Sequence, residues 1–325
     1  MAVGPKLPGE PNPVPGPFHV YHAEAHVLSG HLEHPAKRVL ETYGYVALEN
    51  TLREDHITAL VEETILEGLI SLKRGHTCVS GSQLKNKKDL WGHDRSGWIT
   101  LSTSVIEGLN VFEVITADRM VAQVSTEHAP INGHVPKVTF IGTRFENLRV
   151  GGYPVQVQLD LDICGQKPQG DLSYLEDSGF LDRVRRQLDG IARAKGLPES
   201  LQKQYDAKIA CIDELKKRAG PPAQEYERGN SAVQCSLVKS IEPIPLPGVK
   251  TIGKVIFIPD FGTVSMAEVE VGIEASHTGF APTGSLVSPN RSNYFTLNIL
   301  NMHMGCIAGG KISAGRVKSN GQTNP

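Results

Sequence analysis

The feature that most constrains this chain is an alternation of apolar and polar residues with a period of two, which recurs along most of its length. Between residues 18 and 28, one alternate set contains Phe18, Val20, His22, Glu24, His26 and Leu28, and the other contains His19, Tyr21, Ala23, Ala25 and Val27. Successive side chains of an extended strand point to opposite faces of a sheet, so this period predicts a strand. Similar patterns, separated by turn residues, fill residues 98–128, 137–163, 231–242, 250–274 and 292–317.

The period changes to 3.6 only between residues 171 and 220. Asp177 or Ser178 is placed to cap a helix, and the apolar positions that follow are Phe180, Leu181, Val184, Leu188 and Ile191. A second helical pattern has Pro198 near its start and basic residues in its last turn, namely Lys216, Lys217 and Arg218. We interpret this helical pair, near residues 177–219, as a packing insert or a lid.

Strands, then two helices, then strands again favour a mainly β fold, an antiparallel β-sandwich with an inserted helical pair, because a doubly wound sheet would alternate strand and helix throughout. We expect one domain over residues 18–318, with the insert at 171–220 and a polar tail at 319–325. Residues 1–17 contain six prolines and three glycines, a composition typical of a flexible arm. Gly151 and Gly152 predict a tight hairpin.

One segment, residues 53–83, fits two interpretations. Ile57, Leu60 and Val61 have helical spacing, whereas the β-branched residues and interior glycines of its second half suit a strand.

Composition excludes several classes of partner. The formal net charge is −2. Binding of nucleic acid needs clustered Lys and Arg, so the charge gives no reason to expect a nucleic-acid partner. No apolar run is long enough to span a membrane. Met1 is followed by a Pro-rich stretch in place of the basic and apolar regions of a signal peptide, so we expect a cytoplasmic location, or an extracellular one if a leader has been removed. The five cysteines show no CxxC spacing, which argues against a disulfide framework and a zinc ribbon.

A histidine-rich strand is the main candidate for chemistry. On a strand, His22, Glu24 and His26 share one face at intervals of roughly 7 Å, and a neighbouring strand can supply a further ligand to a bound metal. Imidazole and carboxylate ligands suit zinc, iron or manganese. The candidates for the further ligand are His31, His34 and His128. The alternative, which we favour, is a solvated strand face on which Glu24 is only a hydrogen-bonding partner.

Three weaker candidates remain. Met302, Met304 and Cys306 share one strand face and suggest copper, but His303 faces the other way, as in a buried core strand. His76 lies near Cys78, and such a pair can form an activated nucleophile, but we interpret this proximity as coincidence. Asp160 and Asp162 share a strand face that is more simply explained as solvated.

Three stretches, VTFIGTRFENLRVGGYPV, IPDFGTVSMAEVEV and FTLNILNMHMGCIAGGKISAGRV, occur in the order typical of a known family. In them the chain resembles the choice-of-anchor group of bacterial surface β-proteins, which are secreted. The resemblance covers about a third of the chain. It implies a β-sandwich and brings no catalytic residues. The chain departs from the pattern by its helical pair and by the missing signal peptide and anchoring tail.

Two functions are compatible with these observations. The first is a non-enzymatic β-sandwich that binds or self-assembles as a structural protein, favoured by the strand pattern and by the lack of a G-x-S-x-G elbow or a Walker loop. Its expected partner is a second copy, in a homo-oligomer or polymer, with the Pro-rich arm able to add to a neighbour's sheet edge. The second is a metal-dependent enzyme centred on His22, Glu24 and His26, with a divalent transition metal as cofactor and the helical pair as lid.

Overall fold

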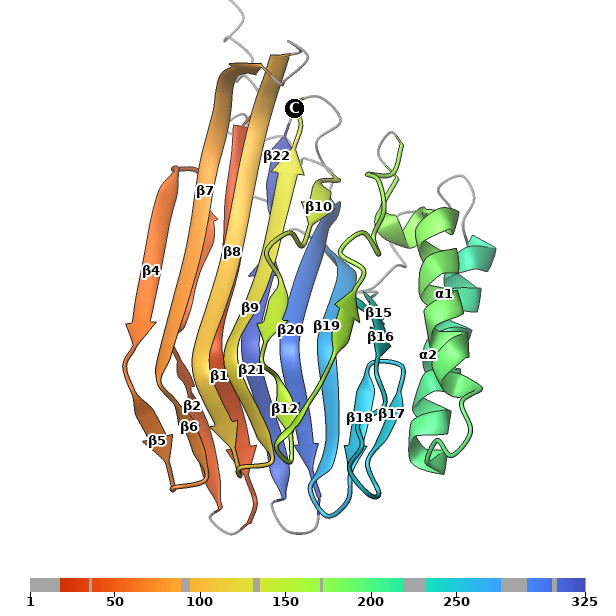
Figure 1. The fold of residues 1–325 in the computed structure, drawn as a ribbon. Helices are drawn as coiled ribbons and strands as arrows, with labels where there is room; N and C mark the ends of the chain where they lie inside the picture. Colours follow the sequence, from red (N-terminus) through yellow and green to blue (C-terminus); the bar gives the residue numbers. More distant parts are fainter. Residues whose placement is uncertain are drawn as a thin grey trace, which may run out of the picture.

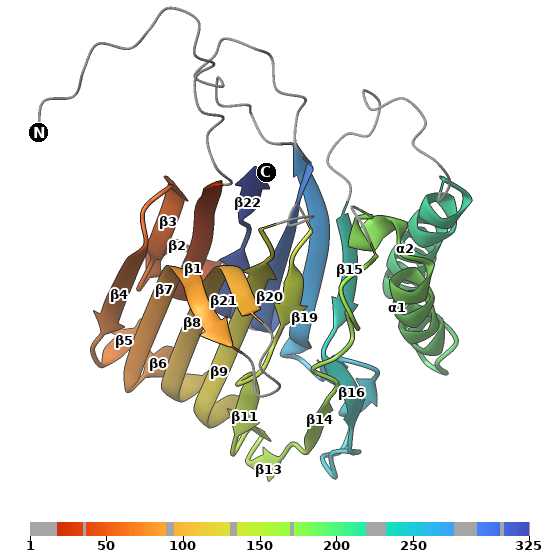
Figure 2. The same cartoon turned by 90° about the horizontal axis from the view of Figure 1, so that it is seen from above.

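The computed structural model describes residues 18–34, 37–88, 94–130, 135–169, 172–218, 232–275, 291–305 and 309–324. Two large antiparallel sheets pack face to face, and two helices lie at one side of them (Figures 1 and 2). This arrangement confirms the predicted β-sandwich with an inserted helical pair. No helix among the described residues is both long and apolar enough to cross a membrane.

The front sheet of Figure 1 has the order β4, β7, β8, β9, β12, β13, with β5 and β6 beside β8 and with β10 and β11 on β9. Its strands are β4 (Asp55–Val61), β5 (Thr64–Leu66), β6 (Ile70–Leu72), β7 (Arg74–Lys88), β8 (Asp94–Val111), β9 (Ile115–His128), β10 (Lys137–Thr139), β11 (Arg144–Glu146), β12 (Arg149–Val150) and β13 (Tyr153–Pro154).

The back sheet has the order β17, β18, β19, β20, β21, β1, β2, with β15 on β19 and with β3 and β22 on β1. Its strands are β1 (Phe18–Leu32), β2 (Arg38–Tyr43), β3 (Val46–Thr51), β15 (Ala232–Ser236), β17 (Lys250–Ile252), β18 (Val255–Ile258), β19 (Gly262–Ala275), β20 (Arg291–Met304), β21 (Gly310–Ser319) and β22 (Gln322–Asn324). A separate two-stranded sheet pairs β14 (Val157–Leu159) with β16 (Val238–Ile241).

The helical insert begins with a 3₁₀ turn, Tyr174–Glu176, and contains α1 (Ser178–Ala192) and α2 (Glu199–Arg218). The Asp177 carboxylate caps α1 by accepting hydrogen bonds from the N–H groups of Gly179 and Phe180. The apolar positions of α1 are buried as predicted, and they are Phe180, Leu181, Val184, Leu188 and Ile191.

Turn chemistry explains two of the hairpins. Phe112 and Glu113, between β8 and β9, have φ values of 54° and 55°. Gly151 and Gly152, between β12 and β13, have φ values of 54° and 82°, which confirms the predicted Gly-Gly hairpin. Two successive residues at positive φ give a twist that matches the twist of the strands they join.

The structure settles one ambiguous segment and corrects one expectation. Residues 55–61, which have helical spacing, form strand β4, because pairing with β7 places Ile57 opposite Val79. The segment expected to be a polar tail contains β22, which pairs with β1, as in Phe18 opposite Asn324. The expected arm, residues 1–17, lies outside the described residues.

Buried hydroxyl groups join the two sheets. Ser102 Oγ and Ser104 Oγ, on β8, donate to the carbonyl oxygens of Lys318 (2.6 Å) and His26 (2.9 Å). Thr126 and Ser319 form a hydroxyl pair at 2.7 Å. Because a buried polar group without a partner is costly, these bonds help to set how one sheet lies on the other.

Candidate functional sites

Strand β1 presents His22 and His26 on the outer face of the back sheet. His22 Nε2 lies 3.1 Å from Glu24 Oε1, and His26 Nε2 lies 3.0 Å from Ser29 Oγ. The hydrogen bond from His22 is the main cause of the lowered pKa of Glu24. Burial, followed by the charge of Arg316, lowers the pKa of His26 to about 4. The three side chains therefore share a face, as their spacing predicts.

His128, the weaker predicted ligand, is the last residue of β9 in the front sheet and faces the inner side of the back sheet. Its side chain is buried between the sheets, and its ring centroid lies 4.6 Å from that of His19, which stacks on Trp98. Burial, with a contribution from His128, lowers the pKa of His19 to about 2. The structure thus does not bring His128 together with His22, Glu24 and His26.

The described residues contain no group of three or more His, Cys, Asp or Glu side chains arranged to hold a metal ion. His31 is exposed and lies 3.6 Å from Glu33, in an ion-pair geometry rather than beside His22. A metal bound by the histidine strand stays a prediction, and nothing in the described geometry supplies its further ligand.

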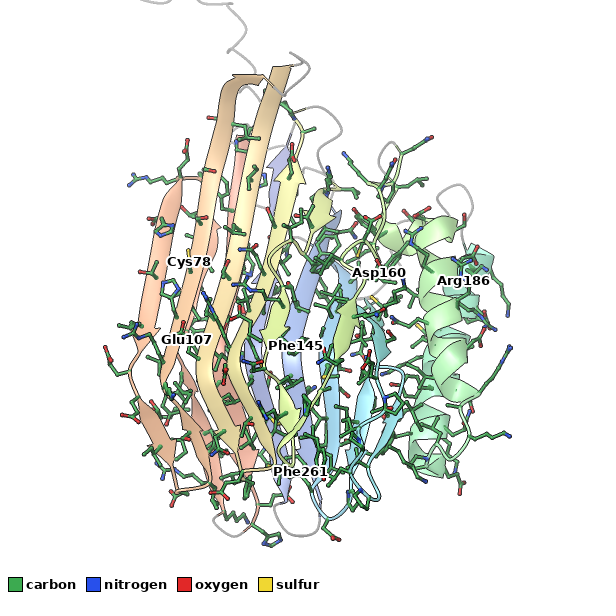
Figure 3. The ribbon with its side chains drawn as sticks, viewed as in Figure 1. Cys78, Glu107, Phe145, Asp160, Arg186 and Phe261 are labelled. Carbon is green, nitrogen blue, oxygen red and sulfur yellow. The ribbon has the colours of Figure 1, made fainter. Side chains whose placement is uncertain are left out.

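Among the weaker candidates, the expectation that Asp160 and Asp162 share a strand face is wrong, because β14 ends at Leu159 and the Asp162 N–H donates to Asp160 Oδ1 (3.1 Å) in the turn that follows. Met302 and Met304 are buried while His303 is exposed, as their alternation predicts, and Cys306 lies outside the described residues. Cys78 is labelled in Figure 3, and its Sγ atom lies 3.7 Å from Nδ1 of His56, on the neighbouring strand β4. Burial raises the pKa of the Cys78 thiol, which disfavours the reactive thiolate.

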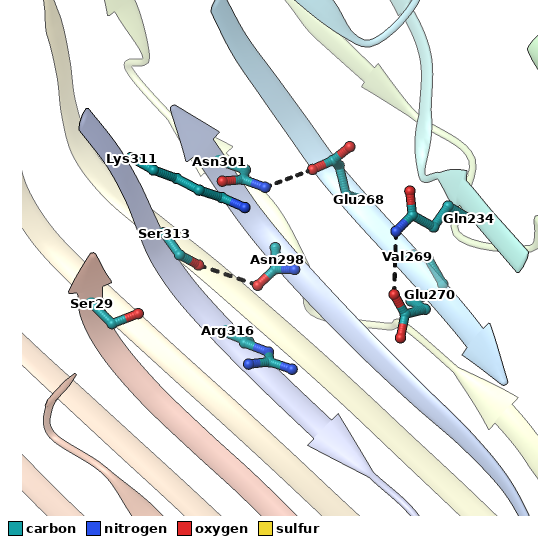
Figure 4. A pocket seen from close by; sticks show the side chains of 10 residues that line it. All are labelled: Ser29, Gln234, Glu268, Val269, Glu270, Asn298, Asn301, Lys311, Ser313 and Arg316. Carbon is teal, nitrogen blue, oxygen red and sulfur yellow. Dashed lines mark hydrogen bonds between the residues drawn. The ribbon is translucent and has the colours of Figure 1, made fainter. Parts of the chain in front are cut away.

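A groove on the outer face of the back sheet was not predicted. It has a volume of about 270 Å³ and is lined by polar side chains of five adjacent strands (Figure 4). Its lining residues are Ser29, Gln234, Glu268, Val269, Glu270, Asn298, Asn301, Lys311, Ser313 and Arg316.

The groove follows a shift in the pleat of four neighbouring strands. In three of the strands two consecutive residues are buried at the same level, where a regular strand would bury one: Met266 and Ala267, Ile299 and Leu300, and Ala314 and Gly315. In β1 the residues at this level are Val27 and Leu28, which follow the buried His26. Outward side chains on either side of the shift are three residues apart, as in Asn298 and Asn301, so their spacing grows from roughly 7 Å to roughly 10 Å. At the level of the shift the four strands therefore present no outward side chain, and the gap between the flanking rows forms the groove.

Gly315 allows this shift. Its φ is 65°, and a Cβ atom added there would lie 2.4 Å from Cγ2 of Ile299. Ala267 also has a positive φ, 44°. Positive φ is uncommon for residues other than glycine, so the shift is a specified feature of the backbone.

A buried ion pair forms one wall of the groove. Lys254 Nζ lies 2.7 Å from Glu268 Oε1, and the Lys254 side chain is 2% exposed. Burial alone would raise the pKa of Glu268, but the charge of Lys254 and hydrogen bonds from Lys254 and Asn301 lower it to about 2. The Glu268 charge likewise raises the pKa of Lys254 against the opposing effect of burial. Both groups are therefore charged at neutral pH.

A second candidate surface lies at the β4 side of the sandwich. Nine large apolar side chains are exposed in the described part of the chain, and five of them lie between residues 39 and 65. They are Val39 (78% exposed), Tyr45, Leu52, Leu60 (56%) and Ile65 (66%). We call these side chains, with the outer edge of β4, the bare edge.

A family model described as a domain of unknown function (DUF8256) matches residues 19–272, which is more than half of the chain. The match begins in β1 and ends inside β19, before the strands that carry Asn298, Asn301, Lys311 and Arg316. No curated protein matches the chain, and no solved structure matches it.

Proposed function

The chain belongs to the family described as a domain of unknown function (DUF8256), and from the geometry of its sheets we propose that it is a non-enzymatic structural module that associates with a second copy of itself. The observation that carries the proposal is the bare edge. Strand β4 pairs only with β7 among the described strands, and apolar side chains are exposed around it.

Strand β4 lacks the features that usually protect an edge strand. Its residues 57–61 contain no charge and no proline. Two other sheet ends are short, since β17 has three residues and β13 has two, one of which is Pro154. The remaining long end, β2, has six residues and carries the charges of Arg38 and Glu41. β4 has seven residues, of which Asp55 at its start is charged, and the uncharged exposed edge that follows is a site for pairing with another strand.

A second copy fits this edge through symmetry. A twofold axis brings an edge strand antiparallel to itself, so its unpaired N–H and C=O groups meet complementary groups. With Thr58 on the axis, Arg53 lies opposite the second copy's Glu63, and Glu54 lies opposite the second copy's Glu62. The favourable and unfavourable charge pairs offset each other, so apolar contacts carry the association and salt has little effect on it.

The opposite side of the sandwich supports a closed dimer rather than a polymer. There the helical pair covers β15, and no large apolar side chain is exposed among the described residues from 173 to 324. A polymer needs two exposed apolar edges, whereas the described residues form one, the bare edge.

Light scattering coupled to size-exclusion chromatography tests the proposal on the full chain. We expect a dimer that dissociates on dilution. Leu60→Lys and Val39→Lys should each weaken it roughly tenfold or more, because each removes an apolar contact worth roughly 1.5–3 kcal/mol and adds a charge. Ile141→Lys is the matched control, since Ile141 is 70% exposed and follows β10, away from the bare edge.

The possible outcomes distinguish pairing of β4 with a second copy from binding of the Pro-rich arm and from an unspecific effect of charge. A wild type that is monomeric at all concentrations would contradict the proposal. Loss of the dimer on deletion of residues 2–17, with Leu60→Lys unchanged, would also contradict it and would assign the contact to the Pro-rich arm. Equal weakening by Leu60→Lys and Ile141→Lys would show that the effect comes from charge alone.

A further inference from the structure

We propose that the groove on the outer face of the back sheet binds an anionic sugar, meaning a sugar ring that carries a carboxylate or a phosphate. This site lies on a different surface from the bare edge, and the two proposals stand on separate observations. Figure 4 shows the side chains that carry the inference.

The carboxylates of the groove already have partners. Glu268 accepts hydrogen bonds from Lys254 (2.7 Å) and from Nδ2 of Asn301 (3.0 Å). Glu270 accepts from the Tyr294 hydroxyl (2.9 Å) and from Nε2 of Gln234 (3.3 Å). All four carboxylate oxygens are therefore engaged by the protein, so the acidic wall does not call for a cation.

The cations of the groove are not paired in the same way. Lys311 and Arg316 are exposed on β21, and within the part of the chain that the structure describes neither makes an ion pair or a side-chain hydrogen bond. Their side chains extend over the groove in Figure 4. Unpaired Lys and Arg donors favour an anionic group, and the planar fork of Arg matches a carboxylate or phosphate.

The amides of the groove favour a hydroxylated ligand. Asn298 Oδ1 faces Ser313 Oγ at 3.3 Å, which leaves the Asn298 amide N–H groups for a ligand acceptor. Asn301 Oδ1 is buried and has no hydrogen-bond partner in the described structure. A buried acceptor without a donor is costly, and a ligand hydroxyl that reaches it removes that cost.

Size and shape agree with a sugar of one or two rings. The volume of about 270 Å³ is slightly below the range of roughly 300–1,000 Å³ typical of small-molecule sites. The lining is almost wholly polar, with Val269 as its one apolar residue. An anionic group near Arg316 and Lys311, with hydroxyls toward Asn298 and Asn301, satisfies the open donors and the open acceptor together.

Three ring compounds of similar size test the proposal by saturation-transfer NMR and titration. D-glucuronate carries the charge and the hydroxyls, D-glucose only the hydroxyls, and cyclohexanecarboxylate only the charge. Glucose 6-phosphate then distinguishes a phosphate from a carboxylate. We expect glucuronate or glucose 6-phosphate to bind at least tenfold more tightly than both single-feature probes.

Matched variants locate the site. Arg316→Gln and Lys311→Gln should each weaken binding of the anionic sugar roughly tenfold, the value of one charged hydrogen bond. Lys137→Gln, at an exposed position on β10 in the front sheet, should leave binding unchanged. Circular dichroism and the midpoint of thermal unfolding check that each variant is folded.

Several results would overturn the proposal. These are binding of none of the probes, equal binding of glucose and glucuronate, equal binding of cyclohexanecarboxylate and glucuronate, or equal weakening in Arg316→Gln and Lys137→Gln. Binding by the dimeric and the monomeric protein alike would show that this site is independent of the bare edge.

Discussion

At one side of the sandwich β15, which pairs with β19 at the margin of the back sheet, lies beside the helical pair. At the other side β4 ends the front sheet with no described strand beyond it (Figure 2). The Gln187 side chain, on α1, accepts from the Ser236 N–H (2.8 Å) and donates to the Ser236 carbonyl oxygen (2.8 Å). A helix side chain thus bonds both backbone groups of Ser236, the last residue of β15. Five of the nine large apolar side chains that are exposed among the described residues lie at the β4 side.

The difference shows two solutions to the same physical problem. Every open sheet leaves unpaired backbone groups and apolar side chains at its ends. These groups are covered either by another part of the same chain or by a partner molecule. On the covered side the chain supplies its own cover between strands β14 and β15. On the β4 side we propose that a second copy supplies it.

The largest expected difference between the two sides concerns apolar side chains. Phe180, on α1, is 0% exposed, so Phe180→Ala should lower the free energy of unfolding by roughly 3–5 kcal/mol through lost burial and a cavity. Leu60→Ala, on the bare edge, should change it by less than about 0.5 kcal/mol. Urea unfolding in dilute solution, followed by tryptophan fluorescence, measures both. Similar costs for the two variants would contradict the comparison.

Ion pairs provide the next comparison. Removing Glu268 as Glu268→Gln leaves the Lys254 charge buried, so we expect a loss of roughly 3–5 kcal/mol. Arg38 and Glu67 form an exposed pair near the bare edge, and Arg38→Gln should cost at most about 1 kcal/mol. Denaturant titrations of the two variants at neutral pH check the contrast, and equal losses would contradict it.

The buried pair also predicts a pH dependence. The pKa of Glu268 is about 2 in the folded protein, below its ordinary value of 4.5, so its stabilisation is present above pH 4.5 and is lost as the pH falls toward 2. Unfolding of the wild type between pH 5 and 2 should show this fall, with a smaller slope in Glu268→Gln. Parallel profiles of the two proteins would show that Glu268 does not contribute.

The smallest expected effect tests the helix side chain that covers β15. Gln187→Ala leaves the backbone groups of Ser236 without their partner and should cost roughly 1–3 kcal/mol. Hydrogen exchange of the Ser236 amide should become faster while amides in the middle of β20 keep their protection. An unchanged Ser236 amide would mean that α1 does not cap this edge.

Much of the fold follows from local patterns. The alternation in β1 predicts that His22, Glu24 and His26 share a face, and Asp177 with the apolar positions of α1 predicts that helix. Whether His128 joins those histidines depends on which face of which sheet it occupies. That is a matter of pairing between distant strands, which local periodicity does not contain.

The groove left a fainter signal in the sequence. Four of the five strands that line it carry two consecutive inward residues, such as Ile299 and Leu300, where alternation would give one. In the sequence, such a pair is only an interruption of the apolar and polar alternation of one strand. The register of the whole sheet is needed to show that the four interruptions lie side by side. The sequence of β4 is ambiguous, because Ile57, Leu60 and Val61 fit a helix and a strand equally. Pairing with β7 decides in favour of the strand.

The most direct test of the bare edge is hydrogen exchange of the β4 amides at two protein concentrations. Alternate N–H groups of β4 point away from β7, so only a partner strand protects them. We predict slow exchange of these amides at high concentration and fast exchange at low concentration, with Leu60→Lys fast at both. Fast exchange at every concentration would show that no second copy pairs with β4.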